Sequence, residues 1–293
     1  MRLQLQQLLE ARVQQCVKEQ RNKDACPKIE RKKASLSKRD AEIVKAKAKG
    51  QITDKIEQND HVDVFYSVHF QYLIKQKGLL YLEEEIEKRK ASFFREKIID
   101  DHELIPPLFP SPSVVSKQHQ QEGSFTPDNK RAYQYNRLKA VQYAEKWWNS
   151  YNPAYMKFEN DCTNFISQCL HQGGAPLWGY PTRGKGWWLR GKNYSYSWAV
   201  ANSLKQYLNL SKQGLRAQAV SSPEQLILGD IICYDFQGNG RFDHNTIVTG
   251  KDATGMPLVN AHTYNSRQRY WAYEDSSAYT PNIQYRFYSI IDG

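Results

Sequence analysis

The chain has 293 residues, 40% of them hydrophobic and 13% aromatic, so it is long and apolar enough for packed cores in two domains. Its five cysteines are odd in number and include no Cys-x-x-Cys pair, so neither a disulfide framework nor a zinc ribbon is indicated, and we expect no metal and no cofactor. No run has the length of a membrane span and the first residues lack a signal-type apolar stretch, so the sequence predicts a cytoplasmic protein.

The positive charge of the chain is concentrated at its start. Residues 1–50 hold 14 Lys and Arg against 6 Asp and Glu, a local charge of +8 within a total of +10. We expect two helices here, from Leu3 to Gln20 and from Leu36 to Lys49, separated by a break at Pro27. The charge indicates either solvated helical faces or a surface for a partner or an anionic polymer. No nucleic-acid motif accompanies it.

Residues 62–94 alternate between apolar and polar side chains, which is typical of an antiparallel meander. A turn is expected at Lys75 to Leu79. Together with the preceding helices, this pattern predicts a small α+β module over residues 1–105, with one sheet face packed on the helices. His61, His69 and His102 resemble no site and are interpreted as ordinary strand or loop residues.

A proline-rich, polar stretch follows and predicts a semi-rigid linker over residues 106–128. The second domain, residues 129–293, is expected to begin with a helix from about Asn129 to Asn149. Leu138, Val141 and Ala144 belong to a broad apolar stripe along that helix, which indicates a core-facing surface.

Cys162 comes at the expected start of a short amphipathic helix, next to Asp161, a favourable N-cap residue. The apolar face of this helix consists of Phe165, Ile166, Cys169 and Leu170, and Gly173-Gly174 predicts its end. Unpaired N–H groups at a helix start favour a thiolate, so the thiol pKa of Cys162 is expected to be lowered. The alternative is a buried structural cysteine.

Several aromatic residues lie in the glycine-rich stretch after this helix. We expect Trp187 and Trp188 to line a substrate cleft, with Arg183 or Arg190 as partners for a carboxylate. The alternative is that the aromatic side chains only cover the domain as a lid.

Two histidines that follow Cys162 fall in an expected β-hairpin. His171 is excluded as a partner because it lies about 13 Å further along the same helix. Folding the hairpin about Ala253 places His244 directly opposite His262, with Cβ atoms about 4.5–5.5 Å apart. A one-residue slip in register would send one of the two rings to the other face.

Several segments, in this order along the chain, resemble the bacterial putative amidase domain family over residues 131–293. They are Tyr135-Asn136-Arg137, Asn152-Pro153-Ala154-Tyr155, Asp161-Cys162-Thr163-Asn164-Phe165, Ser197-Trp198, Leu228-Gly229-Asp230, Asp243-His244-Asn245-Thr246 and Ala261-His262-Thr263. This resemblance implies a papain-like core related to the NlpC/P60 and CHAP cysteine hydrolases, in which a cysteine helix packs on an antiparallel sheet.

The resemblance also implies the site residues and the reaction. Cys162 would be the nucleophile, His244 the base and His262 the orienting residue, with Asn260 as substitute. The Cys162 backbone N–H would bind the oxyanion, with Asn152 or Asn160 as a second donor. Such a site would hydrolyse amide bonds through an acyl-enzyme, in peptides of the peptidoglycan type.

Three alternatives stay open. The domain could be a catalytically silent binding module, or a scaffold directed by the N-terminal module. An amine in place of water would make the enzyme an acyl transferase. Because the enzymes that it resembles commonly act on cell-wall peptides, action at the wall or in a spore also stays open.

Overall fold

The computed structural model describes residues 1–17, 26–105 and 133–293. The predicted linker, residues 106–128, and the first residues of the helix expected from Asn129 lie outside the described residues. Among those that are described, no helix is both long enough and apolar enough to cross a bilayer.

The N-terminal part consists of helices packed on long strands. Its elements are α1 (Arg2–Val17), α2 (Pro27–Ser37), β1 (Ala41–Gln58), β2 (His61–Gln76), β3 (Leu79–Phe94) and β4 (Lys97–Glu103). The predicted meander over residues 62–94 is confirmed, because β2 and β3 pair antiparallel around a turn at Lys77-Gly78. Every second side chain of β2 from Val64 to Ile74 is buried on the face that α1 and α2 cover.

The helix predicted from Leu36 to Lys49 is wrong beyond Ser37, because residues 41–58 form strand β1. Alanine and lysine favour helices by composition, but here they alternate with a period of two. Ala46, Ala48 and Gly50 pair with Tyr72, Phe70 and Val68, which face the helices. The missing Cβ of Gly50 leaves room for Leu9 of α1, since a Cβ there would lie 2.9 Å from the leucine side chain. Packing against α1 therefore decides the conformation of this segment.

The C-terminal part continues the same sheet. Its elements are α3 (Arg137–Trp147), α4 (Cys162–Gln172), β5 (Leu189–Arg190), β6 (Asn193–Tyr194), α5 (Tyr196–Ala199), α6 (Ala201–Leu210), β7 (Arg216–Val220), a 3-10 turn (Pro223–Gln225), β8 (Ile231–Asp235), β9 (His244–Lys251), β10 (Pro257–Ala261), β11 (Ser266–Tyr270) and β12 (Gln284–Ile291).

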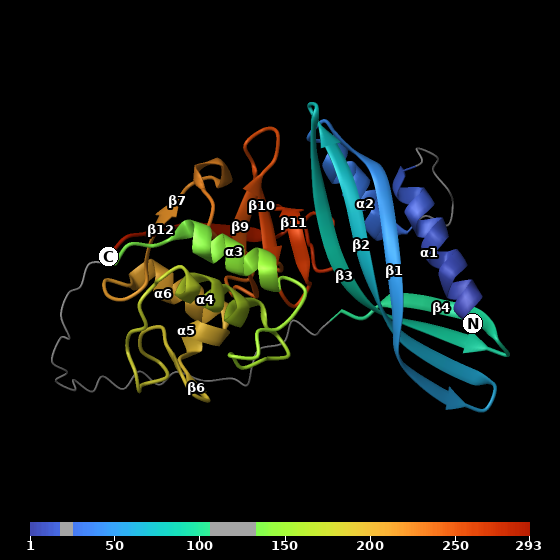
Figure 1. The fold of residues 1–293 in the computed structure, drawn as a ribbon, viewed down its shortest axis with the longest axis horizontal. Helices are drawn as coiled ribbons and strands as arrows, with labels where there is room; N and C mark the ends of the chain where they lie inside the picture. Colours follow the sequence, from blue (N-terminus) through green and yellow to red (C-terminus); the bar gives the residue numbers. More distant parts are fainter. Residues whose placement is uncertain (18–25, 106–132) are drawn as a thin grey trace.

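Within the described residues the sheet has ten strands, in the order β1-β2-β3-β11-β10-β9-β8-β12-β7, with β4 paired to β3. All its strand pairs are antiparallel, and β11 joins the two halves by pairing with β3 (Figure 1). The chain therefore has a mixed α and β fold around one antiparallel sheet.

Two hydrophobic cores lie on the two faces of the C-terminal half of this sheet. One contains Phe165 and Ile166 of α4, Leu204 of α6, and the strand residues Ile231 and Ile247. The other contains Tyr234, Phe236, Val248, Val259 and Tyr273, among others. The helix that begins with Cys162 thus packs on the Ile247 face, which also receives α3.

The β9–β10 hairpin does not have the predicted register. Lys251 pairs with Pro257, so the turn is centred on Thr254 rather than on Ala253. A bulge then changes the pairing from Gly250–Leu258 to Val248–Val259, which leaves Thr249 as the extra residue. An extra residue reverses the facing of every side chain beyond it. Consequently His244 and His262 lie on opposite faces of the sheet, and the predicted histidine pair is wrong.

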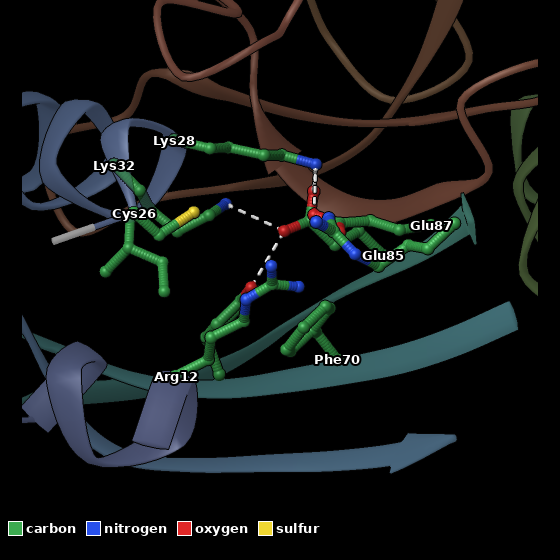
Figure 2. A pocket seen from close by; sticks show the side chains of 10 residues that line it. Arg12, Cys26, Lys28, Lys32, Phe70, Glu85 and Glu87 are labelled. Carbon is green, nitrogen blue, oxygen red and sulfur yellow. Dashed lines mark hydrogen bonds and ion pairs between the residues drawn. The ribbon is translucent and has the colours of Figure 1, made fainter. Parts of the chain in front are cut away.

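Buried ion pairs connect the two halves beside β11. Lys28 and Lys32 of α2 extend toward Glu85 and Glu87 of β3 (Figure 2). The same Lys32 ammonium lies 2.6 Å from a carboxylate oxygen of Asp275, in the C-terminal half. These charges raise the pKa of Lys32 although burial opposes its charged form. Because one lysine is neutralised by acids of both halves, the two halves share a buried electrostatic core.

Candidate active site

Cys162 is the first residue of α4, and its side chain is 5% exposed. Its sulfur lies 3.7 Å from the Thr163 hydroxyl and 3.9 Å from the carbonyl oxygen of Asp243, the residue before β9. Burial raises the pKa of the thiol, while the Thr163 hydroxyl and the N–H groups of Asn245 and Thr163 lower it. The predicted lowering of this pKa is therefore wrong for the buried arrangement, in which desolvation outweighs the donors around the sulfur.

The side chain of Thr263, a residue that follows β10, contacts the start of the same helix. Its hydroxyl accepts hydrogen bonds from the backbone N–H groups of Asp161, at 3.0 Å, and Cys162, at 3.1 Å. The backbone of Thr263 has φ +74°, a left-handed conformation that is unfavourable for a β-branched residue. Strain of this kind persists where surrounding contacts enforce it and is common at functional sites. The N–H predicted to bind an oxyanion is thus held by a strained threonine.

Asp161 binds His262 instead of capping α4 with its side chain. One carboxylate oxygen lies 2.8 Å from His262 Nδ1, and the other accepts from Asn164 Nδ2 and the Phe158 N–H. His262 Nε2 lies 2.7 Å from the carbonyl oxygen of Trp147. Both ring nitrogens thus lie within hydrogen-bond distance of an acceptor oxygen.

The His262 ring also stacks on Phe165 of α4, with ring centroids 3.9 Å apart. With both nitrogens engaged and one face covered, the ring has no free atom to accept a proton from Cys162. Its contacts make it a support for the beginning of α4.

His244 lies on the other face of the sheet, where its ring is surrounded by four aromatic rings. Their centroids lie 5.4–6.0 Å away, and they belong to Tyr234, Phe236, Tyr264 and Tyr273. Burial lowers the pKa of His244 to about 3, and the nearby positive charge of Arg269 acts in the same direction. Its Nε2 is buried without a hydrogen-bond partner among the described residues. The ring is therefore neutral, with one nitrogen available.

The surroundings of His244 and Cys162 overlap. Burial is the main cause that raises the pKa of Tyr264 and of Tyr273 to about 12, and the charge of a Cys162 thiolate contributes to both. The same two tyrosine rings flank His244. Burial also raises the pKa of the Asp243 carboxyl, the neighbour of His244 in the chain, to about 6, helped by the charge of Asp235. The two sites therefore interact electrostatically with the same tyrosines, although no hydrogen bond joins the sulfur to the ring nitrogen in the described part of the chain.

The remaining polar candidates have distinct surroundings. Asn260 donates to Glu145 Oε1 and accepts from Thr249 and from the Gln268 N–H, so its side chain is fully engaged two residues from His262. Asn152 donates to the Tyr143 hydroxyl and accepts from the Ala154 N–H. Asn160 is half-buried, and in the described residues its amide makes no hydrogen bond. Of the predicted oxyanion donors, only Asn160 has an uncommitted side chain.

The predicted aromatic cleft is wrong for its two tryptophans. Trp187 and Trp188 are 0% and 2% exposed, and Trp187 Nε1 donates to Ser167 Oγ on α4. Both belong to the packing of the domain, because this loop folds inward over α4 and α5. Arg183 and Arg190 are exposed, and each lies over a tyrosine ring. They keep their guanidinium groups accessible to solvent.

Sequence reasoning did not assign Thr263 or the Asp161–His262 pair. A signal for the pair was present, since Asp161 adjoins Cys162 and His262 has the spacing of a strand residue on the Asn260 face. The identity of its partner depends on the hairpin bulge, which the sequence does not reveal. No sequence pattern indicates the left-handed backbone of Thr263.

Comparison with known proteins gives the family. Residues 134–288 match the model described as a putative amidase domain, slightly more than half of the chain. An uncharacterized protein of Bacillus subtilis (strain 168), YhbB, is 51% identical over 271 residues, covering 90% of this chain and 86% of its own length. A second uncharacterized protein of that strain, YjcM, is 32% identical over 140 residues, covering 45% of this chain and 31% of YjcM. No solved structure matches. The chain therefore belongs to the putative amidase domain family.

Proposed function

We propose that the protein is a cysteine-dependent amide hydrolase with a papain-like site that cleaves amide bonds in peptides of the peptidoglycan type. The observation that carries this proposal is the position of Cys162. It is the first residue of α4, and its sulfur contacts the backbone immediately before His244. A nucleophile at a helix start has N–H donors beside it for the charge that develops during acyl transfer.

His244 is the better candidate for the base. Its Nε2 is free and its ring is neutral, whereas both nitrogens of His262 are engaged. Because the ring lies on the face of the sheet opposite α4, the proposal requires the start of β9, which touches the sulfur through the Asp243 carbonyl, to shift when substrate binds and bring Nε2 to the thiol. In the proposed reaction His244 takes the thiol proton, the sulfur attacks the amide carbonyl, and the imidazolium protonates the departing amine. Water then releases the acid from the acyl-enzyme.

The oxyanion would be bound by the Cys162 N–H and by the amide of Asn160. The first of these donors is engaged by Thr263 in the free protein, so substrate must displace that hydroxyl. We assign the Asp161–His262 pair a positioning role, because it holds the residue that precedes Cys162 in place. The substrate class and action at the wall or in a spore follow from the wall hydrolases that the sequence resembles.

A catalytically silent binding module is the second candidate. The observation that favours it is the resting state of the pair, a protonated thiol and a neutral imidazole without a hydrogen bond between them. Such a module would bind wall material without turnover and would tolerate Cys162→Ser.

Purified peptidoglycan incubated with the protein distinguishes the two candidates, with mass spectrometry of the released peptides as the readout. We expect release by the unchanged chain and by the control Cys26→Ala, whose half-buried thiol lies in the N-terminal half. Cys162→Ala and His244→Ala should abolish release. Undiminished release by Cys162→Ala would refute cysteine catalysis, and binding without any release would establish the silent module.

A further inference from the structure

A row of lysines lies on the uncovered face of the N-terminal sheet. Lys45, Lys47 and Lys49 pair with Leu73, Gln71 and His69 of β2, which alternate with the residues buried under α1 and α2. All three lysines are exposed and lie on β1, an outermost strand of the sheet (Figure 1). Side chains two residues apart on a strand are separated by about 6.5–7 Å, so the row is a regular array of positive charge.

These lysines make no ion pair in the described residues, whereas two acids on the same face do. Lys45, Lys47, Lys49 and the exposed Lys88 of β3 make no ion pair in the part of the chain that is described. In contrast, Asp63 is paired with Lys90 at 2.7 Å, and Glu84 with Arg267 at the same distance. Exposed Glu42 and Asp54 of β1 also lie on this face and make no ion pair among the described residues. Four unpaired lysines against these two acids leave the face with a positive excess.

The uncovered face of the N-terminal strands lies on the same side of the sheet as Cys162. The His69 ring, next to Lys49 in the sheet, lies 5.6 Å from the Trp148 ring at the end of α3. Tyr151, in the loop that follows, lies 5.1 Å from the His262 ring, and the Lys157 ammonium lies over the Tyr151 ring. Because α3 and α4 pack on this same side of the sheet, the lysine row and the helix start of Cys162 share one side of the molecule.

We propose that the lysine row binds a linear polyol-phosphate polymer alongside the bond to be cleaved. A polymer with a phosphate in each short repeat can place successive charges against successive lysines. The binding surface itself does not require catalysis, although its use in directing cleavage rests on the proposed function. A single-stranded nucleic acid carries the same charge but fits this surface less well. Its binding sites combine charge with aromatic platforms for the bases, and Phe65, which is on this face, is half-buried beside Lys90.

The test uses the full chain with Cys162→Ala, so that binding is measured without turnover. The probe is fluorescently labelled poly(glycerol phosphate), followed by anisotropy at several salt concentrations. We expect Lys45→Gln/Lys47→Gln/Lys49→Gln to weaken binding at least tenfold and to flatten its salt dependence. The matched control, Lys139→Gln/Lys192→Gln/Lys212→Gln, removes three exposed lysines of the other half and should change binding less than twofold.

A triple Lys→Arg variant keeps the charge and should keep the affinity, which separates loss of charge from misfolding of an edge strand. Equal weakening by the control triple, or no weakening by the β1 triple, would overturn the proposal. So would tighter binding of single-stranded DNA with the same number of phosphates. If wall peptides are cleaved but the polymer does not bind, the lysine proposal fails while the proposed function stands.

Discussion

Replacing His244 by phenylalanine should make the protein less sensitive to acid. The neutral ring is buried among four aromatic rings, and its pKa is lowered from 6.5 to about 3. A lowered pKa stabilises the folded state above the unfolded pKa, and this contribution is lost as the pH falls from about 6.5 toward 3. A pH of 5 lies about 1.5 units below the pKa of this histidine in the unfolded chain. One unit corresponds to about 1.36 kcal/mol, so the loss relative to pH 7.5 is about 2 kcal/mol.

Urea unfolding followed by tryptophan fluorescence at pH 7.5 and pH 5.0 measures this effect. We expect the difference in unfolding free energy between His244→Phe and the unchanged chain to shift by about 2 kcal/mol in favour of the variant at pH 5.0. The exposed His102 provides the control, and His102→Gln should give little shift. An unchanged difference for His244→Phe would refute the assignment of a buried, neutral ring.

Three further predictions concern the supports of the site. Lys32→Met should reduce the unfolding free energy by about 3–5 kcal/mol in urea, because Glu83 and Asp275 lose a buried partner, while the exposed Lys38→Met should cost less than about 1 kcal/mol. A double-mutant cycle of Asp161→Asn and His262→Gln should give a coupling energy above about 1 kcal/mol, and additive effects would contradict a direct pair. Thr263→Val should cost about 1–3 kcal/mol by leaving two N–H groups unpaired, and a cost no greater than that of the exposed Thr254→Val would show that the hydroxyl is dispensable.

Periodicity predicted the parts of the fold that repeat regularly. The alternation from Val64 to Tyr72 identified the buried face of β2, and the spacing of Phe165, Ile166, Cys169 and Leu170 identified the core face of α4. The Ala-Lys run of β1 was misassigned because helix-favouring composition and strand periodicity conflict there. Contact with α1, which is distant in sequence, resolves that conflict.

The site was less predictable than the fold, because it depends on one bulge and one buried loop. The extra residue Thr249 reverses the facing of His244 relative to His262, and its hydroxyl donates to Asn260, which is itself buried. The loop with Trp187 and Trp188 contains many glycines, which usually indicate exposure. Its burial depends on contacts with α4 and α5 that have no local signal.

The joint between β3 and β11 has a consequence for how the chain is made. β3 is synthesised well before β11, the strand that completes its pairing, because the elements from β4 to β10 lie between them in the chain. Open strand edges promote association with other chains, and charged residues discourage it. The acidic run Glu83-Glu84-Glu85 lies in the part of β3 that pairs with β11, and this edge is unpaired until β11 has been made. Charge of this kind discourages pairing of the nascent edge with other chains until Arg267 of β11 binds Glu84. Glu83 and Glu85 face the lysines of α2, which precede β3 in the chain.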